Sequence, residues 1–137
     1  MSNGQLYAQR SQKESELGVV NNQLLQVEEK LEQVARAKAK IAILKESAKI
    51  IEYALKELDY EYAYNWYGNR QSHYAYDKYN PTYQEAKRYY ELLDELADEL
   101  VDTERRLNSE KEQYNFLMKQ LQDAIAWIIG EIEKAFN

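Results

Sequence analysis

Apolar residues recur every seven positions along the first part of the chain. This row comprises Val20, Val27, Val34, Ile41, Ala48, Leu55 and Tyr62. A companion row begins with Leu17, Leu24 and Leu31, meets Lys38, and is expected to shift to Leu44, Ile51 and Leu58. A stripe that drifts in this way is typical of a nearly straight helix. The pattern predicts one helix over about residues 6–64, roughly 85 to 90 Å long at 1.5 Å per residue.

The C-terminal two fifths of the chain repeat this pattern. One row comprises Ala86, Leu93, Leu100, Leu107, Tyr114, Leu121, Ile128 and Ala135, and its companion comprises Tyr90, Ala97, Glu104, Lys111, Met118, Ile125 and Ile132. Glu104 and Lys111 are expected to set the register or to extend to water. The run from Thr82 to Glu85 fits a capping box, and Pro81 suits a helix entry. A second helix is therefore predicted over about 82–136.

Two helices of similar length, separated by an irregular tip at 65–81, favour one fold above others. Each helix alone leaves an apolar stripe in water, and packing the stripes together buries both. The sequence predicts an all-α protein, a long antiparallel helix-turn-helix hairpin resembling a coiled coil, as a single unit over 1–137.

The C-terminal turns carry more apolar residues than one facing helix can bury. The excess comprises Ile125, Trp127, Ile128, Ile129, Ile132 and Phe136. Such a surplus predicts a partner-binding face or self-association. The alternative is a well-filled end core, covered by the N-terminal arm of the first helix.

The composition excludes several classes of function. A net charge of −6 and a pI near 4.9 argue against a nucleic-acid partner. The absence of cysteine removes disulfides and thiolate metal sites. The sequence contains no apolar run long enough to span a bilayer, and residues 1–17 lack the apolar core of a signal peptide.

Tyrosines crowd into the segment DYEYAYNWYGNRQSHYAYDKYNPTY at 59–83. His73 is the chain's only histidine, and no paired nucleophile and base accompanies it. The sequence therefore predicts neither an enzyme nor a bound cofactor or metal. Two interpretations stay open for the tyrosines. They form an aromatic cap on the hairpin tip, or a docking surface that includes Tyr64, Tyr74, Tyr76 and Tyr79.

The triplet Trp66-Tyr67-Gly68 lies at the junction of the two helices. Gly68 supplies backbone freedom for a turn. A Trp-X-Gly turn between two amphipathic helices resembles the WXG family, the helical hairpins of Gram-positive type VII (Esx-type) secretion. Longer helices and the aromatic segment after the triplet make the chain most similar to the YwqH-like proteins encoded beside LXG toxins.

The resemblance implies a non-enzymatic targeting factor or chaperone that binds the N-terminal helical domain of an LXG toxin, or another WXG-like protein, and delivers it to the secretion machinery. It implies a cytoplasmic protein that could be exported with its partner. Two matches to the family's Tyr-x-x-x-acid export signal, Tyr53 with Glu57 and Tyr90 with Asp94, are no more than chance predicts. The alternatives are a homo-oligomeric structural coiled coil and a glycan or peptide binder acting through the tyrosine-rich tip.

Overall fold

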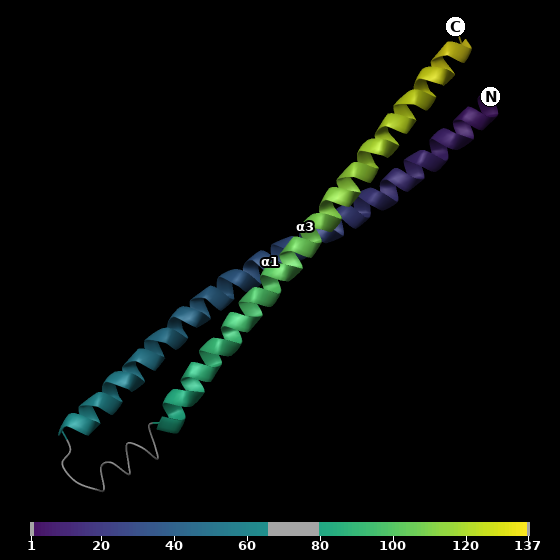
Figure 1. The fold of residues 1–137 in the computed structure, drawn as a ribbon. Helices are drawn as coiled ribbons and strands as arrows, with labels where there is room; N and C mark the ends of the chain where they lie inside the picture. The colour runs from purple at the N-terminus through teal and green to yellow at the C-terminus, as the bar shows by residue number, and fades with distance from the viewer. Residues whose placement is uncertain (1, 66–79, 137) are drawn as a thin grey trace. The chain divides into compact units, whose positions relative to one another are not determined.

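The computed structural model describes residues 2–65 and 80–136. These residues form two helices, α1 over Asn3–Asn65 and α3 over Asn80–Phe136, and contain no strand (Figure 1). The all-α helix-turn-helix hairpin predicted from the apolar rows is confirmed. Neither helix, over the residues described, contains a stretch apolar enough to cross a membrane.

Helix α1 begins three residues before the predicted start because a capping box precedes it. The backbone N–H of Gln5 donates to Ser2 Oγ at 3.2 Å, and the Ser2 N–H donates to Gln5 Oε1 at 3.2 Å. The Leu6 N–H donates to the Ser2 carbonyl at 3.1 Å, which closes the first helical turn. These bonds satisfy donors that a helix start otherwise leaves unpaired.

Helix α3 begins at Asn80, two residues before the predicted start. Pro81 therefore lies in the first turn, where its missing N–H costs no helical hydrogen bond. Thr82 is already helical, so the expectation that it caps the helix is wrong.

The chain divides into two compact units. The terminal unit comprises 1–34 and 103–137, and the central unit comprises 35–102. In each unit, a segment of α1 packs against a segment of α3 along a stripe that we call the seam.

The seam of the terminal unit is mainly apolar. Its buried side chains are Leu6, Leu24, Val27, Val34, Leu107, Ile128 and Ile132. Glu104 and Lys111 are half-buried on the same stripe, as their place in the companion row predicts. The Lys111 Nζ reaches the Glu28 carboxylate across the helices at 3.9 Å, so its alkyl stem stays on the seam while its charge finds a partner.

The seam of the central unit is different. Only Ala48 and Leu93 are buried among its described apolar residues. The companion row of α1 does not shift to Leu44 and Ile51, which are exposed; Leu58 lies outside the part described for side chains. The row continues instead through half-buried Lys38, Lys45 and Glu52.

Two interhelical contacts explain why polar residues can occupy this seam. Lys45 Nζ donates to Asp94 Oδ1 at 2.5 Å, and the Tyr83 hydroxyl donates to Glu52 Oε1 at 3.3 Å. The seam keeps its seven-residue spacing even where polar residues occupy it, which is the geometry of a coiled coil. The predicted drift was wrong because it assumed that only apolar side chains occupy the seam.

Candidate partner-binding surfaces

Most of the predicted tip residues lie outside the described residues. These are Trp66, Tyr67, Gly68, Tyr74, Tyr76 and Tyr79, together with His73. Tyr64 belongs to the last turn of α1, and its side chain lies outside the description. The turn motif and the tyrosine docking surface therefore stay predictions.

The predicted C-terminal face is divided between core and surface. Ile128 and Ile132 are buried in a cluster with Leu6, so they belong to the terminal unit's own core. This is the arrangement expected if the N-terminal arm covers the end. Ile125 and Ile129 are half-buried.

Trp127 and Phe136 are the members of that face with large exposed surfaces, at 58% and 68% of their area. Each exposes an aromatic ring to water although neighbouring turns of α3 bury isoleucines. These two side chains are therefore the part of the predicted face that is open to a partner.

A groove of about 580 Å³ runs along the terminal unit. Its lining consists of Lys13, Ser15, Glu16, Val19, Val20, Leu117, Gln120, Leu121 and Ala124. Val20 and Leu121 are half-buried seam residues, whereas Val19 and Leu117 are exposed beside them. We call this surface the terminal groove. Its floor is apolar, and both helices contribute to it.

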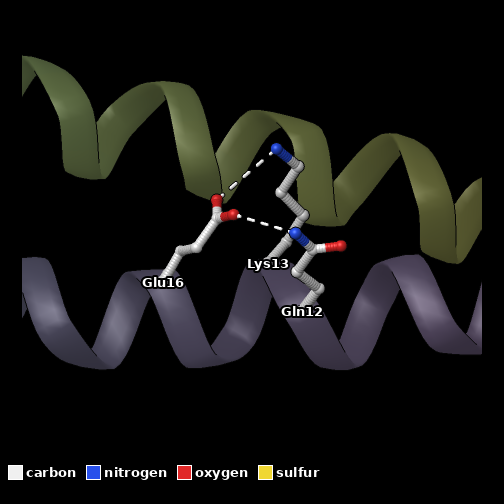
Figure 2. Close-up of polar contacts among 3 residues, drawn as sticks. All are labelled: Gln12, Lys13 and Glu16. Atoms are coloured by element: carbon white, nitrogen blue, oxygen red, sulfur yellow. Dashed lines mark hydrogen bonds and ion pairs between the residues drawn. The ribbon is translucent and has the colours of Figure 1, made fainter.

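Polar side chains of α1 organise one rim of the terminal groove. Glu16 accepts hydrogen bonds from Gln12 Nε2 at 3.4 Å and from Lys13 Nζ at 3.5 Å (Figure 2). These contacts join residues three and four apart, which face each other on a helix. The rim therefore carries a paired lysine and glutamate rather than an isolated charge.

A second apolar surface lies on the central unit. Leu44 and Ile51 each directly precede a seam residue of α1, and Tyr89 and Leu96 each directly precede a seam residue of α3. In an antiparallel pair, positions with this relation to the seam lie on the same side of both helices. The terminal groove shows the same rule, since Glu16 and Leu117 hold equivalent positions and line one groove.

Leu92 is also exposed one turn from Leu96 and extends this side of α3. We call the surface formed by Leu44, Ile51, Tyr89, Leu92 and Leu96 the central apolar face. Each of these side chains exposes between 43% and 54% of its area.

The opposite side of the central unit carries a smaller cavity. A cavity of about 280 Å³ is lined by Lys38, Ile41, Ala42, Lys45, Ala97 and Val101. The Lys45 Nζ also lies 5.5 Å from the centroid of the Tyr90 ring. Its hydrogen bond to Asp94, the largest contribution, raises the pKa of Lys45 above the usual 10.5. Lys45 therefore acts as a clamp between the helices.

The two Tyr-x-x-x-acid matches have local partners. Tyr53 is exposed on α1, and its hydrogen bond to Glu57 raises the pKa of the phenol. Tyr90 is a half-buried seam residue beneath Lys45, which in turn binds Asp94. The second match therefore contributes to the interhelical contact itself.

No group of three or more histidine, cysteine, aspartate or glutamate side chains within 2–65 and 80–136 is arranged to hold a metal ion. Comparisons with protein-family models, curated proteins and solved structures give no match to this chain. The surfaces themselves therefore provide the basis for a functional proposal.

Sequence reasoning missed the terminal groove and the central apolar face. Part of the signal was present, because Leu96 and Leu117 flank the predicted rows of the second helix, whereas Leu44 and Ile51 were predicted to belong to the companion row itself. Apolar residues beside a complete seam indicate a helix pair that can take another helical layer.

Proposed function

We propose that this chain is a non-enzymatic helical partner of a type VII secreted LXG toxin. In this proposal it binds the toxin's N-terminal helical domain, as a targeting factor or chaperone, and assists its export. The likeness of Trp66-Tyr67-Gly68 to the WXG turn motivates the choice of partner. The observation that carries the binding mode is the terminal groove.

The terminal groove has the features of a site for an amphipathic helix. A helix laid along it can cover Val19 and Leu117 while touching the half-buried floor formed by Val20 and Leu121. Helix-in-groove recognition depends on this kind of apolar floor with anchors at helical spacing. Trp127 follows Ala124 by one turn and can extend the contact along α3.

The charged pair on the rim of the groove orients the bound helix. Lys13 and Glu16 present opposite charges at one edge of the groove. Rim charges contribute more to partner choice and association rate than to affinity. A toxin helix with polar residues flanking its apolar stripe suits this edge.

The same proposal gives the chain its place in the cell. It acts in the cytoplasm on the newly made toxin, and the partner supplies the export signal to the secretion machinery. Tyr90 and Asp94 are not available as an independent signal in this proposal, because both contact Lys45.

Co-expression with the N-terminal helical domain of a neighbouring LXG toxin tests the proposal. The two chains should elute together in size-exclusion chromatography. Leu117→Glu should weaken the complex by at least about tenfold, because it replaces an apolar contact residue beside the groove floor with a charge. Phe116→Glu is the matched control, since Phe116 is exposed but does not line the groove. A chain that ignores the toxin domain, or equal effects of the two substitutions, contradicts the proposal.

A further inference from the structure

The central apolar face is large for a unit that buries so little. Five apolar side chains are exposed on one side, whereas Ala48 and Leu93 are the buried apolar residues described in the same unit. A contiguous apolar surface rimmed by polar residues marks an interaction site. The charges of the two helices indicate its occupant.

The two helix segments beneath this face carry opposite charge. Residues 35–57 of α1 contain six lysines or arginines and three acidic residues. Residues 82–102 of α3 contain seven acidic residues and two basic ones. A partner that presents the same two segments in exchanged positions complements both charges at once.

We propose that the central apolar face binds the same face of a second copy of this chain. The α1 segment of each copy packs on the α3 segment of the other, around a two-fold axis parallel to the helices. An isologous contact of this kind needs one self-complementary surface. This inference goes beyond the proposed toxin partner and does not depend on it.

The levels of the residues along the helices agree with this arrangement. The contact between Lys45 and Asp94 fixes which residues lie at the same height within one copy. Leu44 directly precedes Lys45, and Leu96 follows Asp94 by two residues. Ile51 and Tyr89 lie seven positions from Leu44 and Leu96, in the same direction along the antiparallel pair. A two-fold axis parallel to the helices preserves height, so Leu44 meets Leu96 of the second copy and Ile51 meets its Tyr89.

The other two-fold arrangement is electrostatically unfavourable. An axis across the helices stacks α1 on α1 and α3 on α3, which brings basic residues against basic ones and acidic against acidic. Like charges brought together across an interface disfavour that register. In the proposed arrangement, Lys40, one turn before Leu44, lies near Glu99 of the second copy.

Light scattering on the full chain tests the association. The expected mass is twice 16.3 kDa. Ile51→Ser combined with Leu96→Ser should produce a monomer that keeps its helical circular dichroism. Ile43→Ser combined with Ile50→Ser is the matched control, because these isoleucines are 66% and 64% exposed but lie away from the proposed face. A monomeric wild-type chain, or equal dissociation of both variants, overturns the proposal.

Disulfide trapping tests the arrangement, and the absence of native cysteine gives a clean background. Chains carrying Leu44→Cys and chains carrying Leu96→Cys should cross-link when mixed, whereas either chain alone should stay uncross-linked. Cross-linking of each chain with itself, without a mixed product, overturns the α1-on-α3 arrangement. These readouts need no toxin, so their failure is distinguishable from failure of the proposed function.

Discussion

The terminal and central units use the same two helices, but they distribute apolar residues differently. Among the described residues, seven of the nine buried apolar side chains belong to the terminal unit. The central unit has Lys38, Lys45 and Glu52 on its seam and displays Leu44, Ile51 and Leu96 outside it. Both units contain ample apolar residues, so the difference lies in their position relative to the seam.

This difference separates the part of the hairpin that is stabilised by its own packing from the part that leaves apolar surface exposed. A seam filled with leucine, isoleucine and valine stabilises the pair by removing apolar area from water. A seam containing charged residues gains less from burial, and apolar residues beside it gain only when another surface covers them. The terminal unit therefore supports the hairpin through its own seam, whereas the central unit leaves apolar side chains exposed beside its seam, where the proposed second copy would cover them.

The largest expected effect on stability comes from truncating a seam residue of the terminal unit, compared with truncating an exposed neighbour. Leu24→Ala should lower the free energy of unfolding by about 2 to 3 kcal/mol, because it removes a buried side chain. Leu25→Ala should change it by less than about 0.5 kcal/mol, since Leu25 is 54% exposed. Urea unfolding followed by circular dichroism measures both. Equal costs would contradict the assignment of the seam.

Replacing a polar residue of the central seam with an apolar one should raise the free energy of unfolding, because it makes this seam more like that of the terminal unit. Lys38→Leu places an apolar side chain beside Ile41, Ala97 and Val101, which line the same cavity. We expect a net gain of about 1 kcal/mol, because this burial outweighs the interaction that Lys38 gives up. Lys49→Leu, at an exposed position of α1, is the control and should give no comparable gain. A destabilised Lys38→Leu chain would show that the central seam requires the charge.

Replacing glycine with alanine in the helices of the terminal unit should stabilise this unit further. Gly18 lies inside α1, and a Cβ added there meets no atom within 4 Å. Gly18→Ala should stabilise the chain by about 0.5 to 1 kcal/mol, because alanine loses less backbone entropy in a helix. Gly130→Ala offers a second site with the same open surroundings in α3. Thermal unfolding that shows no gain at either position would contradict helical continuity at these positions.

The smallest effect concerns the clamp in the central unit. The hydrogen bond to Asp94 raises the folded-state pKa of Lys45 above 10.5. Its contribution is therefore complete below the unfolded pKa and is lost as pH rises through the folded pKa. The stability difference between the wild type and Asp94→Asn should shrink between about pH 10 and 12. A constant difference across this range would show that the lysine charge is not involved.

The periodic rows predicted the fold because seven-residue spacing carries information along a whole helix. Ala86 through Ile128 in α3 and Val20 through Leu55 in α1 follow their predicted rows without interruption. The companion row of α1 was predicted wrongly after Leu31, since the pattern alone does not show that Lys45 and Glu52 find partners on α3. The start of α1 was missed because its cap, Ser2 with Gln5, precedes the apolar rows.

The candidate surfaces were harder to predict for a physical reason. Ile128 and Trp127 are neighbours in the same apolar run, yet one is buried and the other is exposed. Ile128 is buried because Leu6 of α1 packs in the same cluster. Composition can count a surplus of apolar residues, but interhelical packing decides which of them a partner can reach.

Hydrogen exchange at two protein concentrations tests most directly whether the central unit is built for a second layer. We predict that amides in 35–57 and 82–102 become more protected as concentration rises, while those in 6–34 and 103–132 change little. The Ile51→Ser, Leu96→Ser chain should lose this dependence. Protection that is uniform along both helices and independent of concentration would contradict the distinction between the two units.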